Sequence, residues 1–166
     1  MHVTQRIAPC LWFDHQAEEA AAFYVSVFKN SKILTVARYS NAGLEIHKRP
    51  MGSVMTVAFE LDGQAFTALN GGPAFTFNEA VSLQVSCDNQ EEVDYYWEKL
   101  SKGGDPKSQQ CGWLKDKYGL SWQIVPTVVP EMLKDHESPN AQRAMEAILR
   151  MKKIDIAELE RAFAGQ

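Results

Sequence analysis

The sequence predicts an α+β fold in which two tandem βαβββ modules form curved mixed sheets and C-terminal helices follow. Strand-like alternation and helix-like periodicity occur twice in the same order along the chain. The first helices of the two halves share a residue pattern, and the end of the chain has the period of amphipathic helices. We therefore expect a first module over 1–75, a second module over 76–127 and a helical extension over 128–166 of one compact chain.

The first module is expected to begin with a strand over 7–13, where side chains alternate in character. Asp14 is the expected N-cap of a helix whose apolar stripe runs over 20–28. Asp62-Gly63 predicts a two-residue hairpin, because both central positions of a type I′ turn need a positive φ. The three strands that follow the helix are expected over 32–39, 55–61 and 64–70.

The order restarts with an alternating strand over 80–87 and a capping-box pattern that makes Asp88 the expected N-cap. Residues 17–20 of the first helix align with residues 90–93 of the second, 73 residues further on, which indicates internal duplication. The remaining strands are expected over 111–115 and 120–125. The sheet of one such module has an uncovered face, and pairing two modules would enclose that face as a cavity.

The tail is predicted to contain two helices. Ser138-Pro139 places an N-cap before a proline at the first helical position, and an apolar stripe runs over 141–149. Asp155 followed by Glu158 predicts a second capped start. The apolar faces of these helices must be buried, either on the body of the chain or on a second subunit.

The composition excludes several classes of protein. The 166 residues are 45% apolar and 23% charged, with a net charge of −4. The sequence contains no stripe of basic residues, so nucleic acid is not an expected partner. No run approaches about 18 apolar residues, and no signal-peptide pattern begins the chain, so no membrane segment is predicted and a cytoplasmic location is expected. The three cysteines match neither a CxxC site nor a disulfide framework.

Isolated titratable residues predict no obvious catalytic or metal site. The histidines are too scattered for a helical metal pair, so structural or solvent-exposed roles are favoured. Two pairs of glutamates fall in the first turns of predicted helices, where the helix dipole explains them better than acid/base catalysis does. These residues are His2, His15, His47, His136, Glu18, Glu19, Glu91 and Glu92.

Alternation places a set of polar and aromatic side chains opposite the expected core. If Leu11 and Phe13 pack on the helix, then Cys10 and Trp12 face the concave side. A few neutral hydrogen-bonding groups in an aromatic cavity are typical of a small-molecule site, although simple sheet packing explains the pattern equally well. The candidate ligand-binding residues are Cys10, Trp12, Asn70, Ser82, Gln84, Cys111, Trp113 and Gln123. For the Cys111 thiol alone, a buried structural role is favoured.

Several strings resemble the PhnB-like branch of the vicinal-oxygen-chelate superfamily, which includes glyoxalase, bleomycin-resistance and dioxygenase proteins. They lie at 70–73, 78–83, 111–116, 120–126 and 151–156. The resemblance implies paired βαβββ modules, commonly assembled as homodimers. Domains of this branch often carry the description 3-demethylubiquinone-9 3-methyltransferase, which implies S-adenosylmethionine. Since no glycine-rich nucleotide loop follows a predicted strand, we expect no cofactor.

The resemblance also implies where a divalent metal would bind in active members of the superfamily, which use His, Glu or Gln from four strands. The four positions fall on Ala8, near Ala68 or Asn70, near Ala80 or Ser82, and on Gln123. Only Gln123 has a side chain of a ligating type, and a single amide is a poor site for a divalent ion. We therefore expect no metal.

Three functions remain open. The favoured hypothesis is a metal-free protein that binds a small molecule in an aromatic cavity and does not catalyse a reaction. The second is an enzyme of the glyoxalase/dioxygenase type with an unidentified acid/base group or metal. The third is a non-catalytic dimeric scaffold. A small-molecule ligand and a second copy of the chain are the expected partners, with no nucleic acid and no membrane.

Overall fold

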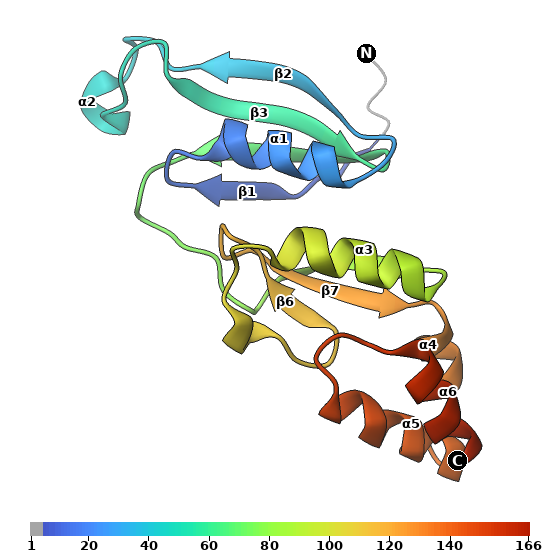
Figure 1. Cartoon of the computed structure of the whole chain (residues 1–166). Coiled ribbons are helices and arrows are strands. Elements are labelled where there is room, and N and C mark those ends of the chain that lie inside the picture. The colour runs from blue at the N-terminus through green and yellow to red at the C-terminus, as the bar shows by residue number, and fades with distance from the viewer. Residues whose placement is uncertain (1–4) are drawn as a thin grey trace. The chain divides into compact units, whose positions relative to one another are not determined.

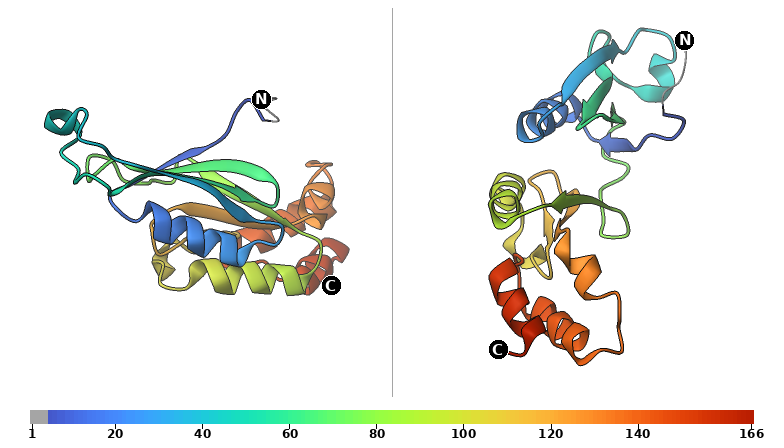
Figure 2. Two further views of the ribbon diagram at one scale, coloured as in Figure 1. Left: turned by 90° about the horizontal axis from the view of Figure 1, so that it is seen from above. Right: turned by 90° about the vertical axis from the view of Figure 1, so that its right-hand side faces the viewer.

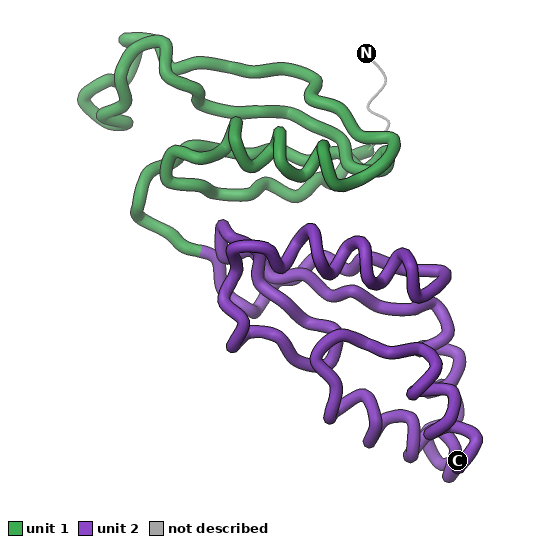
Figure 3. The backbone as a smooth tube through the Cα atoms, in the orientation of Figure 1, with its two compact units in different colours: residues 1–76 green, residues 77–166 purple. Residues whose placement is uncertain are grey.

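The computed structural model of the chain describes residues 5–166. The backbone divides into two compact units, residues 1–76 and residues 77–166 (Figure 3). Each unit contains one sheet, with four strands in the first and three in the second. Strands and helices both contribute to each unit, so the predicted α+β class is confirmed.

The first unit has the element order expected of a βαβββ module, with one short extra helix (Figure 1). Its strands lie in the order β1-β4-β3-β2, with β1 parallel to β4 and the other pairs antiparallel. The sheet is therefore mixed, as predicted. The elements are β1 Cys10–Phe13, α1 Ala17–Val27, β2 Lys32–Arg38, α2 Leu44–His47, β3 Val54–Leu61 and β4 Gln64–Asn70.

Helix α1 packs on one face of the first sheet, where alternate residues of β1, β3 and β4 are buried, whereas every residue of β2 is exposed. Tyr24 of α1 and Phe59 of β3 are fully buried, and Phe59 stacks on Phe66 of β4 with 5.4 Å between ring centroids. The expected N-cap role of Asp14 is wrong, because the chain bends there and enters the helix two residues later at Gln16.

The first turn of α1 is instead capped by a residue from β4. The side-chain Oδ1 of Asn70 accepts a hydrogen bond from the backbone N–H of Ala17 at 2.8 Å. The side-chain Nδ2 of Asn70 donates to the carbonyl of Val54 at 3.1 Å. This one buried amide therefore ties the start of α1 to the ends of β3 and β4.

The second unit has one strand fewer than a full βαβββ module. Its strands lie in the order β5-β7-β6, with β5 parallel to β7 and β6 antiparallel to β7. Between α3 and β6, the chain forms a short 3-10 helix and a single bridge between Gln110 and Trp113. The elements are β5 Ser82–Cys87, α3 Gln90–Ser101, η1 Pro106–Ser108, β6 Trp113–Lys115, β7 Ser121–Pro126, α4 Val128–Met132, α5 Pro139–Arg150 and α6 Ile156–Ala164.

Helix α3 lies along its own sheet as α1 lies along the first (Figure 2). The predicted capping box is present but begins one residue later, since the N-cap is Asn89 and not Asp88. The side chain of Asn89 accepts from the backbone N–H of Glu92, whose carboxylate accepts from the N–H of Asp88. In each sheet, we call the surface turned away from α1 or α3 the distal face.

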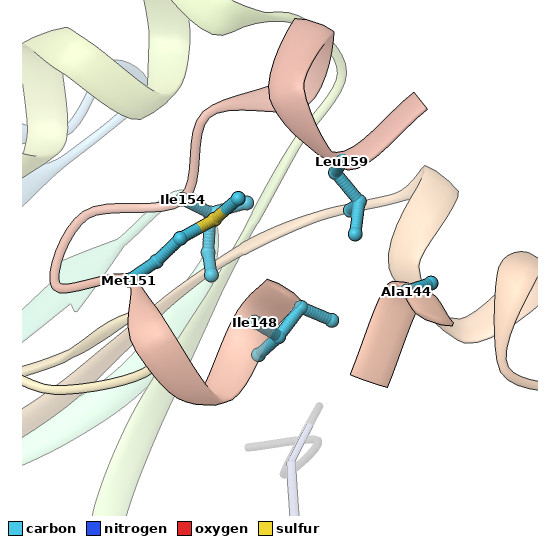
Figure 4. Close-up of a cluster of buried hydrophobic side chains, with 5 residues drawn as sticks. All are labelled: Ala144, Ile148, Met151, Ile154 and Leu159. Atoms are coloured by element: carbon cyan, nitrogen blue, oxygen red, sulfur yellow. The ribbon is translucent and has the colours of Figure 1, made fainter. Parts of the chain in front are cut away.

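Helices α5 and α6 pack on each other and on the rest of the second unit, so part of the apolar surface of the tail is buried there, while Met145 and Leu149 of the predicted stripe are exposed. A cluster of buried apolar side chains joins them: Ala144, Ile148, Met151, Ile154 and Leu159 (Figure 4). Cys111 and Gly112 donate backbone hydrogen bonds to the carbonyls of Met151 and Lys152, at 2.9 and 2.8 Å. The turn before β6 and the loop between α5 and α6 therefore form one continuous backbone network.

Candidate functional site

The distal face of the second sheet brings together four of the eight predicted ligand-binding residues. Trp113 of β6 lies opposite Gln123 of β7, and Gln123 lies opposite Gln84 of β5. Residues paired across neighbouring strands project from the same face, so these three side chains form one row across the sheet. Ser82 lies on the same face, two residues before Gln84.

Hydrogen bonds join the polar members of this group. Gln123 donates through Nε2 to the hydroxyl of Ser82 at 2.8 Å, and Gln84 donates through Nε2 to Oε1 of Gln123 at 3.4 Å. Gln84 is exposed, and Ser82 and Gln123 are half-buried. We call this hydrogen-bonded set of Ser82, Gln84 and Gln123 the amide row, although Ser82 itself lies in the neighbouring row of the sheet, opposite Ser121.

The next row of the same face holds a charged side chain and a buried hydroxyl that the sequence analysis did not place in the site. Lys115 of β6 lies opposite Ser121 of β7, which lies opposite Ser82. The ammonium of Lys115 forms an ion pair with the carboxylate of Glu79, just before β5. A hydrogen bond from Lys115 lowers the pKa of Glu79. The alternation that selected Gln123 also places Ser121 on this face, but local periodicity gives no measure of its burial.

In the first unit, Cys10 and Trp12 lie on the distal face, as the alternation predicted. Leu11 and Phe13 are buried on the helix side, whereas Cys10 is exposed and Trp12 is half-buried. Partial burial raises the pKa of the Cys10 thiol, which disfavours the reactive thiolate. The raised pKa therefore disfavours a nucleophilic role for Cys10.

The ring of Trp12 is fixed by the segment that follows β4. Its indole Nε1 donates to the carbonyl of Gly72 at 2.8 Å, and its ring packs edge-on to Phe75 with 4.9 Å between centroids. Gly71 lies so close to the ring that no Cβ fits between them. Trp12 thus lines the distal face and also holds residues 71–75 in place.

Two of the predicted residues lie away from the distal faces. Asn70 is on the helix side of the first sheet, where both of its side-chain polar atoms bond to the backbone. Cys111 has a φ of 52° in the turn before β6 and packs on the cluster between α5 and α6. We therefore assign Asn70 and Cys111 to the fold and leave them out of the ligand proposal.

The residues at the positions implied for a divalent metal do not fit one. On β4, the distal face presents Thr67 and Leu69, because Ala68 and Asn70 point to α1. In the second sheet, Ser82 and Gln123 are bonded to each other. Among residues 5–166, no three His, Cys, Asp or Glu side chains form a group that could hold a metal ion. Neutral hydroxyl and amide groups are weak ligands for a divalent ion, so we derive no metal-dependent step.

His15 and His47 do not extend the site. Nδ1 of His47 accepts from the backbone N–H of Arg49, and its ring packs on Tyr39. His15 pairs with its neighbour Asp14 at 3.5 Å in an exposed position. His2 lies outside the residues that the structure describes. No helix within residues 5–166 combines the length and apolar character needed to cross a membrane.

Comparison with solved structures defines the class of protein. The chain is similar to the PhnB protein from Bacillus cereus, with 38% identity over 74% of this chain and 100% of that one, and a TM-score of 0.63. It shares its fold with the fosfomycin resistance protein FosX from Listeria monocytogenes, at 15% identity over 82% of this chain and 100% of that one, with a TM-score of 0.54. The FosX structure contains Mn(II) and sulfate.

These likenesses place the chain in the PhnB-like branch of the vicinal-oxygen-chelate superfamily, as its sequence motifs predicted. A family model described as 3-demethylubiquinone-9 3-methyltransferase matches residues 5–125, and the chain belongs to this family. Comparison with the curated proteins found no match. A Pseudomonas aeruginosa protein of 18% identity shares the fold over 74% of this chain and 98% of that one, with a TM-score of 0.55.

Proposed function

We propose that the protein binds a small molecule on the distal faces of its sheets, without a metal held by its own side chains. The observation that carries the proposal is the amide row beside Trp113. A row of neutral hydrogen-bonding groups next to an aromatic ring has the chemistry of a specific small-molecule site. The aromatic cavity expected from the sequence remains part of this proposal.

The amide row has hydrogen-bonding capacity beyond its internal bonds. Each glutamine amide carries two donor hydrogens and an oxygen that accepts two bonds. The row uses one donor of Gln84, and one donor and one acceptor position of Gln123. The remaining groups can bind the polar edge of a ligand while its apolar part contacts Trp113. Cys10 and Trp12 would offer a thiol and an aromatic surface in the first unit.

The enzyme hypothesis is the second candidate. Its support is the family description, which names a methyltransferase, and the fold shared with FosX. The amide row and the residues beside it offer hydroxyl, amide and ammonium groups. In the first unit, the thiol of Cys10 has a raised pKa, and the carboxylate of Glu60 forms an ion pair with Lys32. Such a set favours binding over acid/base chemistry at neutral pH. The scaffold hypothesis, the homodimer and the cytoplasmic location stay predictions.

A thermal-shift screen tests the binding proposal, because a ligand that binds only the native state raises the Tm. The panel includes S-adenosylmethionine and neutral aromatic amides, and each hit is repeated with Gln123→Met. Loss of the shift in Gln123→Met, but not in the exposed control Gln142→Met, is the expected result. A Tm shift with S-adenosylmethionine would instead favour the enzyme. No shift with any compound would favour the scaffold.

Metal analysis of the purified protein is the complementary test. We expect less than stoichiometric Zn, Ni or Mn, because the side chains at the four implied positions are small or neutral. One equivalent of any of these ions, removed by a chelator with a loss of Tm, would overturn the metal-free proposal.

A further inference from the structure

We propose that Lys115 binds a negatively charged group of the ligand, that Ser121 donates a second hydrogen bond to it, and that Glu79 occupies this position until the ligand displaces it. The inference rests on the proposed function and narrows the ligand to a small organic oxyanion with an apolar or aromatic body. Its chemistry is that of a carboxylate or a phosphoryl group.

The position of Lys115 places a charge at one end of the proposed site. Lys115 and Trp113 are two residues apart on β6 and therefore share the distal face. In the next strand, Ser121 lies opposite Lys115 as Gln123 lies opposite Trp113. A ligand that stacks on Trp113 and bonds to Gln123 would thus bring its end group to Lys115 and Ser121.

The Lys115–Glu79 ion pair does not explain the hydroxyl group of Ser121, which is buried without a hydrogen-bond partner. Ser121 is 1% exposed, and its Oγ is the single buried side-chain oxygen or nitrogen of residues 5–166 that has no hydrogen-bond partner. A buried hydroxyl without a partner costs free energy, and such groups commonly mark a position that another molecule fills. Because Lys115 and Ser82 flank Ser121 in the same row, the missing acceptor belongs on the distal face.

The ion pair itself is unequal in its exposure to water. The side chain of Lys115 is 24% exposed, whereas that of Glu79 is 68% exposed. A pair with an exposed carboxylate contributes little to stability, because water and salt compete for both charges. Glu79 can therefore move into solvent at low cost, while a ligand anion would gain the ammonium of Lys115 and the unpaired hydroxyl of Ser121 together.

The alternative is that Lys115 and Glu79 only tether the segment before β5 to β6. The two interpretations predict opposite results for Glu79→Gln. A tether would lose stability and leave ligand binding unchanged. If Glu79 is instead a displaceable carboxylate, Glu79→Gln removes the competitor for the ammonium of Lys115, so anions should bind more tightly.

The experiment uses the full chain and three probes of one shape: benzoate, phenylphosphonate and the neutral benzamide. Dissociation constants come from NMR titrations at low salt. We expect both anions to bind more tightly than benzamide, Lys115→Gln to weaken anion binding about tenfold, and Glu79→Gln to strengthen it several-fold. The relative affinities of benzoate and phenylphosphonate identify the type of oxyanion. Lys102→Gln removes an exposed lysine of the same unit and is the control for net charge. It should change neither the affinity for the two anions nor the affinity for benzamide.

Ser121→Ala separates binding from folding. It removes a hydroxyl that has no partner, so its Tm without ligand should equal or exceed that of the wild type, while its anion affinity falls. Equal binding of anions and benzamide, or equal effects of Lys115→Gln and Lys102→Gln, would overturn the inference and leave the proposed function standing. Failure of all three probes to bind the wild type and Glu79→Gln would overturn both.

Discussion

A methyl group added at Gly71 is expected to destabilise the first unit through Trp12. The Cβ of Gly71→Ala would lie less than 3.0 Å from three atoms of the Trp12 ring, whereas carbon atoms normally touch at about 3.5–4.0 Å. The ring cannot rotate away freely, because its Nε1 is bonded to the carbonyl of Gly72. The φ of Gly71 is not positive, so the effect would be purely steric.

The magnitude follows from the two interactions that must change. Forcing extra volume against a packed ring costs about 1–3 kcal/mol. Losing the hydrogen bond between Trp12 and Gly72 adds about 1 kcal/mol. We therefore expect Gly71→Ala to lower the free energy of unfolding by about 2–4 kcal/mol.

Urea unfolding followed by circular dichroism measures this change. Gly52→Ala is the matched control in the same unit, since its methyl group would meet no atom within 4 Å and only its φ of 83° is unfavourable. That strain alone costs about 1 kcal/mol. If Gly71→Ala were no more destabilising than Gly52→Ala, Trp12 would not lie on Gly71, and its place on the distal face would be refuted.

The remaining predictions concern the second unit. Leu159→Ala removes a fully buried side chain between α5 and α6 and should lower the free energy of unfolding in urea by about 3 kcal/mol. The control Leu149→Ala changes a side chain that is 58% exposed and should cost about 0.5 kcal/mol or less. Equal effects would contradict the packing of the tail. Asp116→Ala should lower the free energy of unfolding by about 3 kcal/mol or more, and with it the Tm. The reason is that the buried carboxylate accepts hydrogen bonds from two backbone N–H groups of its turn and from the indole of Trp122. A Tm within one degree of the wild type would disprove this role. Burial raises the pKa of the Cys87 thiol from 9.0 to about 12, so the native state keeps a proton that the unfolded chain loses above pH 9. Stability should therefore fall as the pH rises from about 9 towards 12. Iodoacetamide at pH 9 should modify Cys87 only when urea unfolds the protein, which mass spectrometry can check. Rapid modification of the native protein would count against the burial of this thiol.

Local sequence patterns predicted most of the strands and helices. Gln64–Asn70 has the same bounds in the prediction and in the structure, and the hairpin at Asp62-Gly63 has positive φ at both positions. The capping residues were harder to predict. The cap of α1 is the Asn70 side chain, 53 residues away from the N–H that it accepts, and no local pattern contains that information.

The candidate site also has features that local sequence patterns predicted and features that they did not. Alternation predicted that Ser82, Gln84 and Gln123 face away from their helix, because each strand side chain points opposite to its neighbour. Which residues meet across the strands depends on register, which places Gln84 opposite Gln123 and Lys115 opposite Ser121. The burial of Ser121 and the ion pair beside it also come from tertiary structure, since residues distant in sequence create both.

The sequence by itself determined the α+β class, the order of the main strands and helices, the family, and the face on which residues such as Trp12, Ser82 and Gln123 lie. Each of these depends on local periodicity or on motifs written in consecutive residues. Only the tertiary structure decided that Asn70 caps a helix, that the tail packs on its own unit, and that a buried hydroxyl lies next to a lysine. These features require contacts between distant segments, and the free energy of such contacts depends on a register that local patterns do not specify.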